Sequence, residues 1–211
     1  MSSRLKDFGL YLITDSKLTR KNAIEDVKAA INGGVKIVQY REKEASTKQM
    51  IKEAGEIRKI CQKNNVLLII NDRIDVAIAV DADGVHLGKE DMPYKHARKL
   101  LGKSKIIGLS AHSVKDALQN QKLGADYTSI GPIYHTTTKI PARKPISLES
   151  VKQLKNKLKI SFVAIGGINN SNIDDVLKAG AKNIAIISGI VAKNDVKGAV
   201  NKIIKTINSY K

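Results

Sequence analysis

Short apolar runs alternate with longer amphipathic stretches along the whole chain. The runs are rich in Val, Ile and Leu and lie at residues 9–14, 35–40, 66–71, 83–88, 105–111, 126–131, 161–167 and 183–188. Between them, apolar residues recur at helical spacing, most clearly at residues 22–33, 47–62, 114–124, 147–158 and 172–181. This pattern predicts strands that alternate with helices, and therefore a parallel sheet covered by helices.

The number of these units indicates how the sheet is arranged. Eight strand–helix units in 211 residues, with no low-complexity linker between them, favour a closed barrel over an open sheet. An open dinucleotide-binding sheet would need a glycine fingerprint directly after its first strand, where this chain has Thr14, Asp15 and Ser16. We therefore expect an α/β fold, a single-domain (β/α)8 TIM barrel spanning residues 1–211, with its chemistry at the carboxyl ends of the strands.

The second predicted strand carries the most informative polar residues. Side chains alternate across a strand, so one face would hold, in order, Val35, Ile37, Gln39, Arg41 and Lys43. Two apolar residues would then fill the barrel, and an amide and two cations would line its mouth. This order fits an anion-binding site. The alternative is a strand that leaves the sheet into a charged loop in solvent.

Two aspartates follow neighbouring strands. Asp72 comes directly after Asn71 at the end of the third predicted strand, and Asp91 follows the fourth. Carboxylates from adjacent strand ends could hold Mg²⁺, which prefers hard oxygen ligands and accepts phosphate oxygens. Each aspartate could instead cap the N-terminus of a helix.

Small and hydroxyl-bearing residues follow the last three strands. Glycines occur at 166–167 and at 189, next to Ser188, and loops at these places in barrels often bind phosphate through backbone N–H groups. The long polar connection at 135–147 includes a Thr-x-Thr-Lys sequence at 136–139, which suits phosphate oxygens. Ordinary turns are the alternative in both places.

Composition narrows the classes of function. The net charge is +17, but the lysines are spread over all the predicted helices and only 4% of residues are aromatic, so we expect no nucleic-acid partner. No apolar run approaches the roughly 20 residues that span a bilayer. The start of the chain does not resemble a secretory signal. The single cysteine, Cys61, excludes an internal disulfide and is expected to be a buried helix residue. These features predict a cytoplasmic protein without a membrane partner.

The histidines indicate little chemistry of their own. His112 follows Ser110 at a strand end and could contact a ligand, whereas His86 is expected in or beside a strand. We find no Ser-His-Asp arrangement and no pair of carboxylates of the glycosidase kind, so a hydrolytic reaction is not favoured.

The ordered set of motifs resembles the thiamine-phosphate synthase family over nearly the whole chain. The motifs are YLITD at 11–15, VQYREK at 38–43, LLIINDR at 67–73, DGVHLGKEDM at 83–92, GLSAH at 108–112, DYTSIGPIYHTTTK at 126–139, AIGGI at 164–168 and ISGI at 187–190. Two positions depart from the family pattern, Lys89 where glutamine is usual and Ser147 where glycine is common.

The resemblance implies a role for each candidate site residue. The pyrophosphate of a pyrimidine diphosphate would be held by Arg41, Lys43, Asn71 and Lys139. Gln39 and Ser110 would contact the same substrate, and Asp72 and Asp91 would bind Mg²⁺. A thiazole phosphate would be positioned by Thr136, Thr138, Gly167, Ile187 and Ser188. The residues expected to act in catalysis are Arg41, Lys43, Lys139 and Ser110.

The resemblance also implies the reaction, in which 4-amino-2-methyl-5-hydroxymethylpyrimidine diphosphate and thiazole phosphate give thiamine monophosphate and pyrophosphate. The expected course is a dissociative substitution on small-molecule substrates. Two alternatives are a thiazole tautomerase-like barrel, disfavoured by the presence of both Asp72 and Asp91, and a protein that only binds nucleic acid or a phosphorylated ligand. The sequence leaves a homo-oligomer open.

Overall fold

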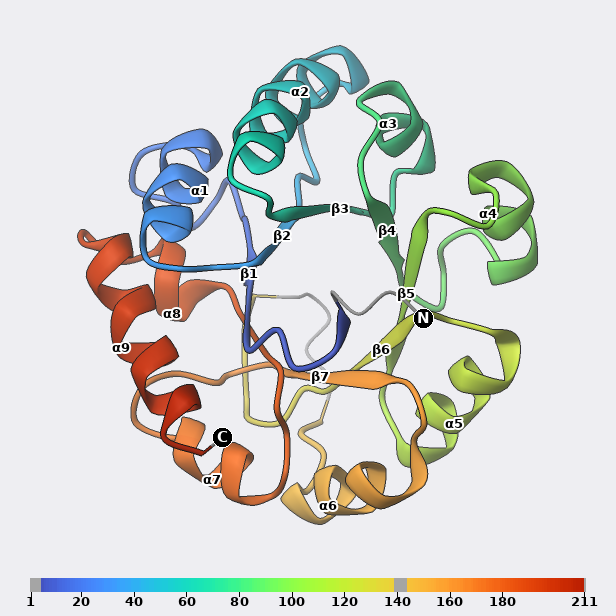
Figure 1. Ribbon diagram of the computed structural model, residues 1–211, viewed down its shortest axis with the longest axis vertical. Coiled ribbons are helices and arrows are strands. Elements are labelled where there is room, and N and C mark those ends of the chain that lie inside the picture. Colours follow the sequence, from blue (N-terminus) through green and yellow to red (C-terminus); the bar gives the residue numbers. More distant parts are fainter. Residues whose placement is uncertain (1–4, 139–143, 211) are drawn as a thin grey trace.

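The structure, a computed structural model, describes residues 5–138 and 144–210. Eight parallel strands close into a barrel in the order β1 to β8, and the helices form a ring outside them (Figure 1). The strands are β1 (Leu10–Ile13), β2 (Ile37–Tyr40), β3 (Leu67–Asn71), β4 (Gly84–Leu87), β5 (Ile106–Ala111), β6 (Tyr127–Ile130), β7 (Ser161–Ile165) and β8 (Ile184–Ile186). Each strand lies inside one of the eight predicted apolar runs, so the predicted TIM barrel is confirmed.

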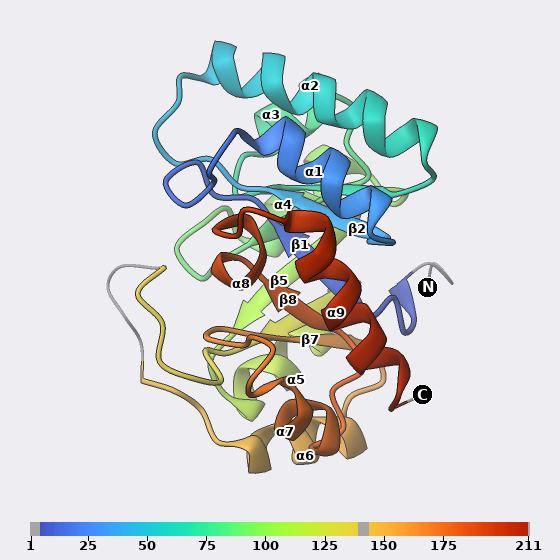
Figure 2. The same ribbon diagram turned by 90° about the vertical axis from the view of Figure 1, so that its left-hand side faces the viewer.

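The helices follow the strands in regular alternation, with two after β8. They are α1 (Ala23–Asn32), α2 (Thr47–Lys63), α3 (Ile74–Ala79), α4 (Tyr94–Leu101), α5 (Val114–Leu123), α6 (Leu148–Lys157), α7 (Ile173–Lys178), α8 (Ser188–Val191) and α9 (Val196–Asn208). In the side view of Figure 2, α1, α2 and α9 lie along the outside of the strands. No helix in the described ranges is both long enough and apolar enough to cross a membrane.

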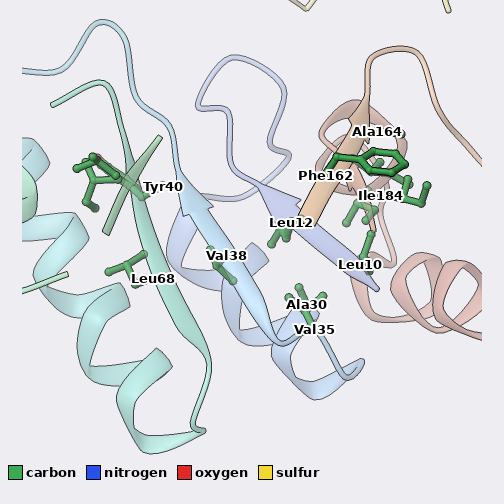
Figure 3. Close-up of a cluster of buried hydrophobic side chains, with 14 of the residues drawn as sticks. Leu10, Leu12, Ala30, Val35, Val38, Tyr40, Leu68, Phe162, Ala164 and Ile184 are labelled. Atoms are coloured by element: carbon green, nitrogen blue, oxygen red, sulfur yellow. The ribbon is translucent and has the colours of Figure 1, made fainter. Parts of the chain in front are cut away.

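The larger hydrophobic core lies between the strands and the surrounding helices. Leu12 of β1, Val38 of β2 and Leu68 of β3 point into it, together with buried residues of the helices. Figure 3 shows part of this core, including Val35 beside Ala30 of α1. The prediction that Val35 shares the inward face with Ile37 is therefore wrong. Strand β2 begins only at Ile37, so strand alternation does not extend back to Val35.

A second core fills the inside of the barrel. Its buried members are Leu5, Tyr11, Ile13, Ile37, Leu67, Ile69, Ile106, Tyr127, Val163 and Ala185. Glycine at inward positions leaves room for the large ring of Tyr127. A methyl group on Gly108 would lie 2.1 Å from Cζ of that ring. Backbone register and side-chain volume together fix how β5 and β6 meet inside the barrel.

We expect Gly108→Ala to destabilise the fold by about 3 kcal/mol, the upper part of the usual range for overpacking a core. The Tyr127 ring cannot move away cheaply because it is fully buried and its hydroxyl is hydrogen-bonded to Tyr11 and His86. Urea denaturation of the wild type and the variant would measure this. Gly55→Ala is the matched control, because Gly55 lies within α2 with no atom near the added methyl, and alanine should stabilise that helix by about 1 kcal/mol. Equal stability of the two variants would contradict the packing argument.

Cys61 lies in α2 and is fully buried in the outer core. Burial raises the pKa of its thiol to about 12, so it remains protonated at neutral pH. The prediction of a buried cysteine within a helix is confirmed.

Candidate active site

A cavity of about 390 Å³ lies at the carboxyl ends of the strands. It brings together residues from all eight strand–loop units named in the sequence analysis. The predicted site residues that line it are Gln39, Arg41, Lys43, Asn71, Asp72, Asp91, Ser110, Thr136, Thr138, Gly167, Ile187 and Ser188. His112 lines it as well. Lys139 lies outside the described residues. The structure therefore gathers every predicted site residue that it describes around one cavity.

Arg41 is held at the cavity by the loop after β1. Its guanidinium forms an ion pair with Asp15, a residue only 5% exposed. Its backbone N–H donates to Oγ1 of Thr14 at 2.9 Å. Because both partners are largely buried, the pair is weakly screened by solvent and fixes the direction of the guanidinium. Sequence reasoning passed over Asp15, although its place directly after a strand was visible in the sequence.

Lys43, Asp72 and Asp91 form a charged cluster on the β2–β4 side of the cavity. The Lys43 ammonium contacts Oδ2 of Asp72, and the Asp72 and Asp91 carboxyls are close enough that each shifts the pKa of the other. The N–H of Gly88 donates to Oδ2 of Asp91 at 2.6 Å. Burial raises the pKa of Asp72, but the interactions with Asp91 and the ammonium outweigh it, so the pKa is lowered overall. Burial and the neighbouring Asp72 raise the pKa of Asp91.

Neither aspartate caps a helix. The N-cap residues of α3 and α4 are Arg73 and Pro93, and neither makes a side-chain cap hydrogen bond. Asp72 instead has a left-handed backbone with φ of +59°, a conformation that aspartate tolerates better than most residues. Its carboxylate contacts the Lys43 ammonium and does not cap α3. The helix-cap alternative from the sequence is therefore excluded for both residues.

The donor set of this cluster is compatible with a magnesium ion. Two carboxylates this close repel each other unless a proton or a cation lies between them. Hard carboxylate oxygens are suitable ligands, and Mg²⁺ commonly keeps several waters or takes phosphate oxygens for its remaining positions. Among the described residues, no group of three or more His, Cys, Asp or Glu side chains could hold a metal ion by itself. A bound ion at Asp72 and Asp91 would therefore need oxygens from a ligand or from water.

Asn71 adds a free donor beside this cluster. It ends β3 and lies opposite His86 of β4 in the parallel register. Within the described residues its buried Nδ2 atom has no hydrogen-bond partner. A buried amide without a partner is costly, so a bound ligand that accepts from it would gain that interaction.

The opposite side of the cavity is built from the loops after β6, β7 and β8. Gly166 and Gly167 both have positive φ, +100° and +67°, which favours glycine. The loop after β6 packs closely on them, since a methyl group on Gly167 would lie 2.6 Å from the carbonyl oxygen of His135. The carbonyl of Gly167 accepts from Asn172 at 2.9 Å, which stiffens the turn. The glycines thus have a packing role besides the backbone approach they offer to a ligand.

Among the lining residues that were not proposed as site residues from the sequence are three polar side chains inside the barrel. Tyr11, His86 and Ser129 all lie on inward positions of their strands. Strand alternation could have placed them inside the barrel, but their mutual contacts depend on how strands across the barrel are offset. Lys89 also lines the cavity and pairs with Asp116 at 2.9 Å. Ser147, the other departure from the family pattern, is the N-cap of α6.

Comparisons with known proteins converge on one family. A family model described as thiamine monophosphate synthase matches residues 10–190. The thiamine-phosphate synthase of Methanosarcina mazei is 49% identical over 100% of this chain and 87% of that protein. That of Chloroflexus aurantiacus is also 49% identical, over 95% of this chain and 93% of the relative. The solved thiamine phosphate pyrophosphorylase from Pyrococcus furiosus superposes with a TM-score of 0.90 at 38% identity, covering 98% of both chains.

Proposed function

The chain belongs to the thiamine monophosphate synthase family and is a transferase of thiamine biosynthesis, and we propose how its cavity carries out the reaction. The substrates are 4-amino-2-methyl-5-hydroxymethylpyrimidine diphosphate and thiazole phosphate. The products are thiamine monophosphate and pyrophosphate. The observation that carries this proposal is the convergence of Arg41, Lys43, Asp72 and Asp91 around one cavity.

The diphosphate would lie on the β2–β4 side of the cavity. Arg41, Lys43 and Asn71 offer N–H donors there, and Lys139 from the β6 loop would complete the set. Asp72 and Asp91 would hold Mg²⁺, which would neutralise charge that develops on the leaving pyrophosphate. The thiazole phosphate would lie against Thr136, Thr138, Gly167, Ile187 and Ser188. Gln39 would contact the pyrimidine, and Ser110 would contact the same pyrimidine diphosphate; both line the cavity.

The chemical step is a dissociative substitution at the methylene carbon of the pyrimidine. The C–O bond to the diphosphate breaks with its electron pair, leaving a cation stabilised by the pyrimidine ring. The lone pair of the thiazole nitrogen then forms the new C–N bond, and the positive charge ends on the thiazolium ring. The Arg41 guanidinium is held by the buried Asp15 before the reaction, so it stabilises the departing charge with little reorganisation, and Lys43 adds a second positive charge beside it. No protein nucleophile takes part.

The two sides of the cavity would also bring the two substrates close together. Backbone turns at Gly166–Gly167 and at the start of α8 hold one substrate while the β2–β4 cluster holds the other. Holding both reactants in line converts a bimolecular step into an intramolecular one. We place this reaction in the cytoplasm, with small molecules as the partners.

The test is to mix the purified chain with both substrates and Mg²⁺. We expect thiamine phosphate and pyrophosphate to form in equal amounts, and removal of the metal with EDTA to stop both. Chromatography for thiamine phosphate and a coupled pyrophosphate assay measure the two products. Isomerisation of thiazole phosphate without pyrophosphate release would instead support the tautomerase-like alternative. No reaction with either substrate would reject the proposal.

A further inference from the structure

A chain of buried polar side chains crosses the inside of the barrel just beneath the cavity. The Nε2 amide of Gln39 donates to the hydroxyl of Tyr11 at 3.0 Å, and that hydroxyl lies 2.9 Å from the hydroxyl of Tyr127. The Tyr127 hydroxyl lies 3.0 Å from Nδ1 of His86. On the other side of the ring, Nε2 of His86 lies 3.0 Å from Oγ of Ser110 and 3.4 Å from Oγ of Ser129. The chain thus connects β2 to β5 through three other strands.

The side chains that form this row of hydrogen bonds are buried, and their burial restricts how they can pair. Gln39, Tyr11, Tyr127 and His86 are all at most 8% exposed and lie among apolar side chains of the inner core. The His86 ring is stacked on the Tyr127 ring, with centroids 5.5 Å apart. Burying these groups unpaired would be costly, so each donor in the chain must find an acceptor.

The direction of the hydrogen bonds follows from this requirement. Tyr11 accepts from Gln39, and within the described residues its own hydroxyl proton has one acceptor, the oxygen of Tyr127. Tyr127 therefore accepts from Tyr11 and donates its proton onward to Nδ1 of His86. Because Nδ1 accepts this hydrogen bond, it carries no proton, and a neutral imidazole then carries its proton at Nε2.

The same reasoning extends to Ser110 at the cavity wall. Nε2–H of His86 donates to Oγ of Ser110, the nearer of the two serine hydroxyls beside it, so the Ser110 oxygen is an acceptor in that contact. The hydroxyl proton of Ser110 then points elsewhere. Ser110 is partly exposed and lines the cavity, so its hydroxyl proton can reach an acceptor atom of a ligand bound there.

We propose that His86 is a positioning residue for the reaction: Gln39, Tyr11 and Tyr127 hold it as the Nε2–H tautomer, and that tautomer commits the Ser110 hydroxyl proton to an acceptor atom of the pyrimidine diphosphate. The proposal rests on the proposed function of this cavity. It assigns His86 no contact with the substrate. In the opposite tautomer, Nε2 would be an acceptor and the Ser110 hydroxyl would donate its proton to it. Only the lone pairs of the Ser110 oxygen would then face the substrate, and they cannot bind an acceptor atom.

The tautomer can be measured directly on the ¹⁵N-labelled enzyme. The nitrogen chemical shifts of His86, identified from the signals that disappear in His86→Gln, should show an unprotonated Nδ1 and a protonated Nε2. Tyr127→Phe removes the donor to Nδ1 and should reduce the population of this tautomer. A proton on Nδ1 in the wild-type enzyme would overturn the proposal, whatever the variants do.

Kinetics test whether His86 acts through Ser110. Ser110→Ala and His86→Asn should each lower kcat/KM for the pyrimidine diphosphate about 30-fold, the scale expected for one hydrogen bond in a buried site. If His86 works only by orienting Ser110, the double variant should be within about threefold of Ser110→Ala. Multiplication of the two losses to about 900-fold would overturn the proposal, because it would show independent roles.

Two further variants separate positioning from general damage. His86→Gln places an amide donor near the position of Nε2 and should recover part of the activity that His86→Asn loses. His96→Asn, at an exposed position of α4, should leave kcat/KM unchanged. Thiazole phosphate affinity, measured calorimetrically, should be the same in all these variants. Absence of product from the wild-type enzyme would overturn the proposed function alone, whereas an Nδ1–H tautomer in an active enzyme overturns this inference alone.

Discussion

Asp72→Ala is expected to lower kcat about 1,000-fold while leaving the affinity for thiazole phosphate within about twofold of the wild type. A metal ion stabilises developing charge by several kcal/mol, and about 4 kcal/mol corresponds to a 1,000-fold change in rate. The carboxylate belongs to the cluster with Lys43 and Asp91, on the β2–β4 side of the cavity. The proposed thiazole phosphate site lies on the β6–β8 side, so its binding should survive. Steady-state kinetics and calorimetry measure the two quantities.

The backbone at Asp72 calls for a second variant. A φ of +59° strains alanine by about 1 kcal/mol more than it strains asparagine, which tolerates the left-handed region. Asp72→Asn should therefore fold as well as the wild type and still lose most of the activity, because the negative charge is gone. Asp75→Ala is the matched control, since Asp75 is exposed at the start of α3 and pairs with Arg73 outside the cavity. An Asp72→Ala enzyme with unchanged Mg²⁺ dependence would remove this carboxylate from the metal site.

The barrel itself could be predicted because two simple patterns agree. Apolar, β-branched runs of strand length alternate with helical spacing eight times, and few folds accommodate that alternation in one chain. The prediction of which side chains point inward was wrong only at the beginning of β2. Val35 is apolar and has the inward parity, but it lies before the first residue of β2 and packs outward against α1. Alternation predicts a face only within the strand, and its start depends on the preceding turn.

The cavity could be predicted to a similar degree for a related reason. Barrels place their chemistry at one end of the strands, so polar residues at predicted strand ends were expected to meet there. The cavity lining agrees with that expectation. The roles assigned to those residues, and to Lys139, remain predictions from the family resemblance.

The contacts between side chains of distant strands could not be predicted. Tyr11 and Tyr127 are 116 residues apart in the chain, and their hydroxyl groups meet only because the closed barrel offsets its strands by a particular amount. Asp15 likewise finds Arg41 across two loops. A single sequence carries no direct signal of such pairs, which are set by the packing of the whole interior.

Arg41→Lys is expected to reduce kcat/KM for the pyrimidine diphosphate about 100-fold, although the positive charge is kept. The guanidinium has several N–H groups in a rigid planar fork, so it can pair with Asp15 on one side and present donors to a diphosphate on the other. A lysine ammonium is a compact charge on a flexible stem, and the nearby Asp15 carboxylate would draw it out of line. Removing one preorganised donor from a charge-stabilising site typically costs 100- to 1,000-fold in rate, about 3 to 4 kcal/mol.

The controls for Arg41→Lys separate a loss of substrate contact from a loosened loop. Arg20→Lys makes the same change in an exposed residue of the same loop region, where the side chain donates to the carbonyl of Ala192, and should leave kcat/KM unchanged. Asp15→Asn removes the charge that orients Arg41 and should raise KM for the pyrimidine diphosphate while thiazole phosphate binds normally. If Arg41→Lys instead weakened both substrates equally and lowered the melting temperature, Arg41 would be a structural partner of Asp15. A selective loss for the diphosphate substrate is the outcome that a preorganised cation requires.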